Sequence, residues 1–271
     1  MVLSINNNSL SSGLLSGLNK AQDRELTALQ RIGSGKKVNS AADNAAAVAI
    51  IERFAAQITG FGQSIRNSSD GISFTQVADA GLSTISDDIQ RIRELSIQSA
   101  NGSLTDGDRA TLQSEVVQLQ QGIGQSIDRA NFNGVDIFKT DAVISFQVGA
   151  SADDSIDLST QNLADDFTDF SSIDISTQAG AQSALADIDA VLQTVTEQRV
   201  NFGAIQNRLE SSITDLENNR VNTIAARSRM EDADIAREVS EQIKGSIQQQ
   251  SGIAVQSLAN SSAELVLRLL S

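Results

Sequence analysis

Five residue types are missing from this sequence: it contains no Cys, His, Pro, Trp or Tyr, and nine Phe are its only aromatic residues. Without Cys there is no disulfide and no thiol nucleophile, and without His there is no imidazole acid–base catalysis and no Cys/His zinc site. Without Pro nothing locks φ or removes a backbone donor, so long uninterrupted helices are allowed. The composition excludes several classes of enzyme and favours a helical protein.

Long hydrophobic runs are absent as well. No stretch reaches the roughly 18 apolar residues of a membrane span, and the first residues, MVLSIN, lack the basic and apolar regions of a secretory signal. We therefore expect no membrane partner and no export through a cleaved signal peptide.

Basic residues are scarce in the middle of the chain. The formal net charge is −14, and residues 140–198 contain no Lys or Arg although they contain eleven acidic residues. The remainder is nearly balanced in charge. An acidic, solvated middle disfavours nucleic acid as a partner, and balanced ends are typical of segments that pack against other protein.

Apolar residues recur at alternating spacings of three and four in long segments, which predicts coiled-coil-like helices. A cluster of turn residues at 101–108 separates two of these segments and predicts that their helices fold back on each other. The stripes are Leu82, Ile85, Ile89 and Ile92; Leu112, Val116, Leu119, Ile123 and Ile127; and Ile188, Leu192, Val195, Phe202, Leu209, Ile213 and Leu216, the last with polar interruptions at Arg199 and Gln206.

Both ends of the chain are amphipathic too. One stripe contains Leu14, Leu18, Ala21, Ala28 and Ile32, and the other contains Val255, Leu258, Leu265 and Leu269. A terminal helix with an apolar stripe and no core of its own needs a partner, so we expect the two terminal helices to pair through these stripes. Residues 33–40 break the pattern and read as a linker.

Strand signals cluster in one region. Asn133-Gly134 is a hairpin-type dipeptide followed by alternating residues 135–137, and residues 144–148 and 156–158 predict two further short strands. These segments predict a small β region at the tip of a helical rod. The fold class is therefore mainly α, with a small β-hairpin region.

The chemistry of a reactive site is not evident. Paired carboxylates abound but lack apolar neighbours, and Asp153, Asp154 and Asp157 lack the spacing of a Ca²⁺-binding loop. The Gly-Lys run at 33–37 lacks the spacing of a phosphate-binding loop. No catalytic residue, metal site or cofactor is predicted.

Seven segments resemble, in order along the chain, the two terminal signatures of bacterial flagellin. The N-terminal ones are SGKKVNSAAD at 34–43, IRNSSDGIS at 65–73, QRIRELSIQ at 90–98 and NFNG at 131–134; the C-terminal ones are QNRLE at 206–210, ARSRMEDAD at 226–234 and VLRLL at 266–270. Lys36 and Asn44 depart from the usual apolar and acidic residues of the first segment.

The resemblance implies a domain plan. Residues 1–44 would form the N-terminal half of an inner domain with its spoke, 45–231 a rod domain with a β-hairpin region around 132–175, and 232–271 the C-terminal half of the inner domain. The terminal helices would pair coaxially. The short passage from Phe132 to Gln182 leaves no room for separate outer domains, so a short form with inner and rod domains only is expected.

The resemblance also implies a function. The chain would be a structural subunit, not an enzyme, that polymerises into the extracellular bacterial flagellar filament for motility. Its implied partners are further copies of itself, an export chaperone, the filament cap and hook-junction proteins. The family leaves the cell through a type III apparatus, and a chain without Cys and Pro suits passage in an unfolded state.

Two alternatives are considered. A hook–filament junction protein has similar ends, but segments 90–98 and 226–234 follow flagellin closely. An enzyme on a flagellin scaffold would need a His/Glu metal motif, and this chain has no His.

The resemblance implies a receptor site. Asp88, Arg91, Leu95 and Gln98 form a stripe beside the core stripe and are expected to face away from it. This stretch is similar to the flagellin segment read by Toll-like receptor 5, and Arg91, Leu95 and Glu115 match its central positions. We expect the same surface to contact a neighbouring subunit in the filament, so that only the monomer is recognised.

The acidic segment 141–177 is expected to be exposed outward and dispensable for assembly. Its hydroxyl residues are candidate glycosylation sites, the alternative being a plain solvated loop. They are Ser151, Ser155, Ser159, Thr160, Thr168, Ser171 and Ser172.

Overall fold

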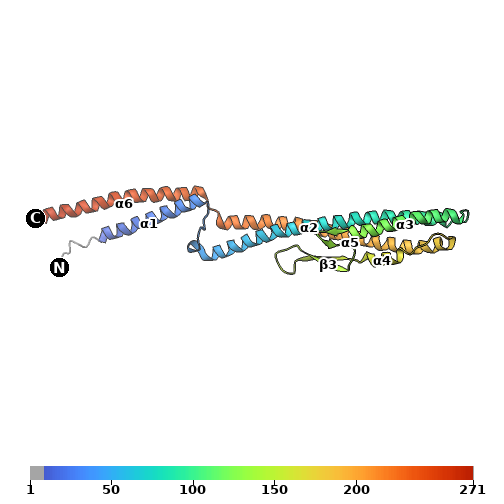
Figure 1. Cartoon of the computed structure of the whole chain (residues 1–271). Coiled ribbons are helices and arrows are strands. Elements are labelled where there is room, and N and C mark those ends of the chain that lie inside the picture. The colour runs from blue at the N-terminus through green and yellow to red at the C-terminus, as the bar shows by residue number, and fades with distance from the viewer. Residues whose placement is uncertain (1–8, 271) are drawn as a thin grey trace. The chain divides into compact units, whose positions relative to one another are not determined.

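The computed structural model describes residues 9–270, with the side chains of 9–11, 166, 169 and 262–270 outside the description. Figure 1 shows long helices with a small β region. The elements are α1 (Ser9–Ser34), α2 (Ala41–Ser99), α3 (Asp106–Arg129), β1 (Asn131–Phe132), β2 (Val135–Asp136), β3 (Ala142–Gln147), β4 (Ser155–Thr160), α4 (Leu163–Phe170), α5 (Gln178–Glu231) and α6 (Ile235–Leu270). The predicted fold class, mainly α with a small β region, is confirmed.

The chain forms two compact units. Unit 1 contains the chain up to Ala56 and from Asn222 onward, and unit 2 contains Gln57–Val221. Each long helix, α2 and α5, contributes to both units. The domain boundaries expected from the sequence, at 44/45 and 231/232, stay a prediction.

The core of unit 2 lies where α2, α3 and α5 meet. The predicted stripes supply it: Leu82, Ile85, Ile89 and Ile92 of α2 are fully buried, as are Val116 and Ile123 of α3 and Ile188, Val195 and Leu209 of α5. Arg199 of α5 bonds Asp79 of α2, with 2.9 Å between Nε and Oδ1. The heptad periodicity therefore predicted the core-facing side of these helices.

A polar turn joins α2 to α3. The hydroxyl of Thr105 accepts a hydrogen bond from the amide of Asp108, whose carboxylate in turn accepts from the backbone and hydroxyl of Thr105. These bonds lower the pKa of Asp108. The buried guanidinium of Arg109 donates to the carbonyl oxygen of Asn101 at 2.9 Å. The predicted reversal is confirmed, and it forms one end of unit 2 (Figure 1).

Two antiparallel strand pairs form the β region. Asn133 (φ 51°) and Gly134 (φ 80°) make the tight turn between β1 and β2, as the dipeptide predicted. In the second pair Ala142 lies opposite Thr160.

The expected place of the β region, at the tip of the rod, is wrong. The side-chain amide of Asn67 in α2 donates to the carbonyl oxygen of Gln147 at 3.0 Å, and a Cβ on Gly71 would lie 3.2 Å from the ring of Phe146. The strand β3 therefore lies along the flank of α2 (Figure 1). The reason is that α3 returns along α2 before the strands begin.

Part of the segment between β3 and α5 packs into the core, although many of its polar residues are exposed. Leu163, Phe167 and Phe170 of α4 are buried, as are Ile173 and Ile175 after it. Two glutamines of α3 bond to its backbone: Gln120 donates to the carbonyl of Phe170 at 2.9 Å, and Gln113 accepts from the amide of Ile175 at 2.7 Å. The expectation that the whole of 141–177 is exposed is therefore only partly correct, and its outward placement in the filament stays a prediction. The signal was present, because apolar residues at 163, 167 and 170 have helical spacing.

Unit 1 contains the antiparallel pair of α1 and α6, which pack along each other. Arg31 near the end of α1 bonds Glu238 near the start of α6, and a Cβ on Gly252 further along α6 would meet Leu18 of α1. The predicted association of the two terminal helices is confirmed.

Candidate subunit interface

Small and polar residues form the seam between α1 and α6. On α1, Ala21 and Ala28 are each only 2% exposed, while Leu14 and Leu18 are half-buried. Across the seam Gln242 donates to Glu25 at 3.5 Å, and Arg31 pairs with Glu238 at 3.3 Å. Half of the predicted contact, the α1 stripe, is therefore present.

Glycines on α6 allow α1 to approach closely. A Cβ on Gly245 would lie 3.2 Å from the Cβ of Glu25 and 3.3 Å from the carbonyl oxygen of Ala21. A Cβ on Gly252 would lie 3.1 Å from Leu18. Gly costs helix stability, about 1 kcal/mol relative to Ala, so its value at these two positions is the space that it leaves for α1.

Because Gly and Gln form the seam, the apolar side chains of α6 point away from α1. Ile235, Val239, Ile243 and Ile247 recur every four residues and are 37–57% exposed. Ile253, Val255 and Leu258 of α6 and Leu15, Leu26 and Leu29 of α1 are exposed as well. We call these ten residues the apolar face of unit 1. An apolar surface of this kind is typical of an interaction site.

The predicted C-terminal stripe is thus only partly correct. Val255 is 45% exposed and Leu258 is 69% exposed, so neither packs on α1 as expected. The side chains of Leu265 and Leu269 lie outside the description. The physical reason is that Gly245, Gly252 and Gln242 of α6 contact α1, although small and polar residues suggest an exposed side of a helix when only the sequence is considered.

The segment after α1 is a paired crossing, not a plain linker. The amide of Lys37 donates to the carbonyl oxygen of Glu231 at 2.6 Å, and the amide of Ala233 donates to that of Gly35 at 2.9 Å. Gly35 has φ +70°, a conformation that favours glycine. The two connections of unit 1 are therefore held together by backbone bonds.

A buried carboxylate lies at this crossing. Glu231 accepts from Nζ of Lys36 at 2.6 Å and from Nε of Arg227 at 2.7 Å. Lys36 first, and then Arg227, hold the pKa of Glu231 below its ordinary value of 4.5. Lys36, which departs from the family pattern, therefore has a specific partner.

Replacing Glu231 by Gln is expected to destabilise the chain at neutral pH by about 1–2 kcal/mol, because two cations lose their acceptor. The pKa of Glu231 is lowered, so its contribution is complete above pH 4.5 and is lost as the pH falls through the lowered value. The gap between wild type and variant should close in acid. Circular dichroism melts over a descending pH series measure it, and a gap that is constant with pH would contradict this role.

The departure at Asn44 also has a local cause. Asn44 is extended (φ −165°, ψ 96°), and its side-chain oxygen accepts from the amide of Ala47 at 3.0 Å, so it caps the long part of α2. Backbone bonds from Ser40 and Asn39 lower the pKa of the neighbouring Asp43.

The candidate receptor site of unit 2 is only partly exposed. Arg91 donates to Glu115 at 2.8 Å and to Glu94 at 2.9 Å, and the side chains of Arg91 and Glu115 are 49% and 44% exposed. These bonds, that to Glu115 first, raise the pKa of Arg91. Arg91 and Glu115, which the resemblance names together, are therefore neighbours across α2 and α3, and their role at a receptor stays a prediction.

Leu95 does not face away from the core, and this part of the prediction is wrong. It is 1% exposed and lies in the same hydrophobic core as Ile92. Because α2 packs against both α3 and α5, its buried arc is wider than a two-helix seam. The exposed apolar residue nearby is Ile97, at 50%.

The candidate glycosylation residues separate by exposure. Ser151, Ser155, Ser159, Thr168, Ser171 and Ser172 are exposed. Thr160 is 5% exposed, and its hydroxyl donates to the carbonyl oxygen of Thr140 at 3.1 Å, which corrects its inclusion.

No group of three or more acidic residues in 9–270 is placed to hold a metal ion. No helix in that range has the length and hydropathy of a membrane span.

The fold and the apolar face define a helical structural protein with surfaces suited to packing against other chains. Comparison with known families is specific: "Bacterial flagellin N-terminal helical region" matches residues 5–142, and "Bacterial flagellin C-terminal helical region" matches 185–270. A flagellin of Halalkalibacterium halodurans is 38% identical over 257 residues, which cover 94% of each chain. The chain belongs to the bacterial flagellin family.

Two solved structures are similar to this one. The crystal structure of Bacillus cereus flagellin has a TM-score of 0.52 at 28% identity, covering 56% of this chain and 88% of that one. A putative flagellar hook-associated protein of Vibrio parahaemolyticus has a TM-score of 0.59 at 16% identity, covering 70% of this chain and all of that one. The second likeness concerns the fold alone.

Proposed function

We propose that this chain polymerises into the flagellar filament as its structural subunit. The observation that carries the proposal is the apolar face of unit 1, whose ten residues stay 37–69% exposed among the described residues. Burying the exposed part of these side chains against other copies would stabilise an assembly, each by a part of the about 1.5–3 kcal/mol of a fully buried side chain. Contacts between unlike surfaces of successive copies generate an open helical polymer.

We propose type III export to the cell exterior, with an export chaperone, the filament cap and hook-junction proteins as partners. Membership of the flagellin family supports this proposal. The absence of Cys and Pro supports passage as an unfolded chain, since neither disulfides nor slow prolyl isomerisation intervene.

The test is polymerisation of the purified full-length chain. Monomers obtained by heating should form filaments on cooling at high protein concentration, visible by electron microscopy and pelleted by ultracentrifugation. A chain that stays monomeric across a series of protein concentrations, temperatures and salt concentrations would contradict the proposal.

The alternative, a hook–filament junction protein, predicts a different abundance. A filament subunit makes up most of the protein in sheared flagella, whereas a junction protein is present in few copies. Quantitative mass spectrometry of sheared filaments separates the two. The likeness to the hook-associated structure concerns the fold alone and favours neither.

A second function, as ligand of Toll-like receptor 5 in the monomeric state, is supported by one surface feature. Arg91 and Glu115 form an exposed charged pair across α2 and α3, joined by Glu94. Arginine is frequent among the residues that dominate binding energy at protein interfaces. Because Leu95 is buried, we propose the charged pair alone as the contact.

Replacing Arg91 by Ala is expected to weaken receptor binding by about 2 kcal/mol, roughly 30-fold in Kd. The control is Arg93→Ala, because Arg93 makes a similar exposed pair, with Asp189 at 2.7 Å, outside the proposed contact. Surface plasmon resonance on folded monomers measures both. Equal affinity of the two variants and the wild type would overturn the proposal.

A further inference from the structure

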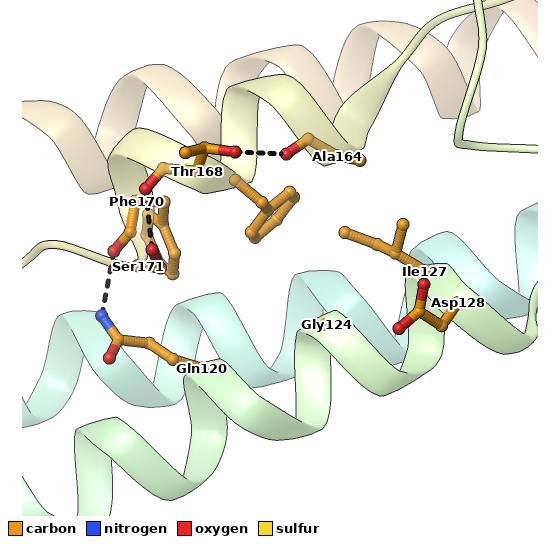
Figure 2. Close-up of a pocket in the computed structure, with 9 residues that line it drawn as sticks. Gln120, Gly124, Ile127, Asp128, Ala164, Thr168, Phe170 and Ser171 are labelled. Carbon is orange, nitrogen blue, oxygen red and sulfur yellow. Dashed lines mark hydrogen bonds between the residues drawn. The ribbon is translucent and has the colours of Figure 1, made fainter.

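A pocket opens between α3 and α4 of unit 2. Figure 2 shows Ile127 and Asp128 near Gly124 of α3, and Phe170 and Ser171 above Gln120, with Thr168 on the α4 side. Its volume is about 260 Å³. A Cβ on Gly124 would meet nothing within 4 Å, so the pocket is open above this glycine.

The floor of the pocket is apolar and its rim offers acceptors. The rings of Phe167 and Phe170 meet edge to face with centroids 5.2 Å apart. The hydroxyls of Thr168 and Ser171 donate to the backbone of α4, and Nε2 of Gln120 donates to Phe170. The donors of the rim are thus used. Oε1 of Gln120 accepts no hydrogen bond among the described residues, and the side chain of Asp128 is 72% exposed. A matching guest has an apolar stem and a donor at its end, which describes an arginine.

The charge around the pocket favours the same guest. Residues 140–198 contain no Lys or Arg, and α4 itself contains three Asp. Oδ1 of Asp128 pairs with Lys139 at 3.2 Å, which leaves Oδ2 as the acceptor for a guest. An arginine without an acidic partner in its own chain would gain the most electrostatic attraction from these acidic surroundings.

Arg220 of α5 is such an arginine. It is exposed, makes no hydrogen bond or ion pair among the described residues, and is followed by Val221, which is 64% exposed. Arg208, the other unpaired arginine of α5 in unit 2, instead lines a groove of its own chain with Ile156 and Asp215.

Arg220 cannot reach the pocket of its own chain. Glu115 of α3 pairs with Arg91 of α2, and the two helices are antiparallel. Ile127 lies 12 residues after Glu115 and Asp79 lies 12 residues before Arg91, so Ile127 and Asp79 lie at the same level along the helix pair. Asp79 in turn pairs with Arg199, and Arg220 lies 21 residues further along α5, roughly 30 Å at 1.5 Å per residue. Guest and pocket therefore belong to different copies, and their contact is head to tail.

We propose that the pocket between α3 and α4 receives Arg220 and Val221 of a second copy of this chain. The inference rests on the proposed polymerisation and names one contact within it. A contact between two different surfaces extends into an open series of copies, as a filament requires.

Crosslinking of assembled full-length chain tests the contact directly, because a chain without Cys has no other thiol. In the variant Thr168→Cys with Val221→Cys, a short bismaleimide should link successive copies into a ladder of multimers. The matched control is Thr168→Cys with Asn207→Cys, beside Arg208, which should give no ladder. Filaments that give no ladder with the first variant, or equal ladders with both, overturn the contact.

Substitutions provide a second readout. Arg220→Glu, or Gly124→Leu to fill the pocket, should raise the critical concentration for polymerisation at least about tenfold, the loss of roughly one charge-assisted contact. Arg208→Glu and Gly203→Leu are the matched controls, since a Cβ on Gly203 also meets nothing within 4 Å. Normal polymerisation of both test variants refutes the contact and leaves the proposed function intact, whereas failure of the wild type to polymerise refutes the proposed function itself. Should a variant lose helicity by circular dichroism, the crosslinking result decides.

Discussion

Deletion of residues 232–271 is expected to abolish filament formation. The deletion removes α6 with seven of the ten residues of the apolar face, and it exposes Ala21 and Ala28 of α1. The core of unit 2 lies within residues 74–209, so that unit should stay folded. Electron microscopy and sedimentation should show soluble protein without filaments, and circular dichroism should show retained helix.

A single substitution tests the pairing of α1 with α6 without removing any residues from the chain. At Gly245 even an added Cβ would lie 3.3 Å from the carbonyl oxygen of Ala21. The larger side chain of Gly245→Leu therefore forces α1 and α6 apart. Gly17→Leu is the matched control on α1, where a Cβ meets nothing within 4 Å. Normal filaments from the deletion variant, or from Gly245→Leu, would contradict the dependence of assembly on the terminal pair.

Local periodicity explains which parts of the fold could be predicted. Ile85, Ile89 and Ile92 recur at helical spacing, and Asn133-Gly134 has the backbone preference of a tight hairpin. Both signals depend only on near neighbours in sequence. The three long helices of unit 2, their reversal and the two strand pairs were therefore predicted correctly, whereas the short helix α4 was missed.

Long-range packing explains what could not be predicted. Leu95 is buried because α2 has neighbours on two sides, and no pattern within α2 states how many helices surround it. The backbone pairing of Lys37 with Glu231 joins segments far apart in sequence. Gly245 reads as a weak helix position until α1 is placed against it. In each case the deciding partner lies elsewhere in the chain.

The exposed candidate sites show the same limit. Arg91 and Glu115 were found because a family resemblance, not periodicity, marked them, and the structure brings them within 2.8 Å. The pocket between α3 and α4 had no signal in either helix alone. Gly124 is an open position and Gly71 a packed one, but both are simply glycines in helical segments of the sequence.

Substitutions in the acidic segment 141–177 test how far the stability of unit 2 depends on residues outside the long helices. Phe170 is 2% exposed, its ring meets that of Phe167, and its carbonyl oxygen accepts from Gln120. Phe170→Ala should lower the free energy of unfolding of unit 2 by about 3–5 kcal/mol, the usual cost of emptying a buried aromatic site. Val143→Ala, at a residue of the same segment that is 67% exposed, should change it by less than about 0.5 kcal/mol.

Denaturant unfolding of the monomer, followed by circular dichroism, measures both variants. A large loss at Phe170 with none at Val143 means that the segment is an integral part of the core, so its deletion would cost assembly through the fold and not through a lost contact. Equal stability of Phe170→Ala and the wild type would instead restore the expectation from sequence that this segment is a dispensable surface.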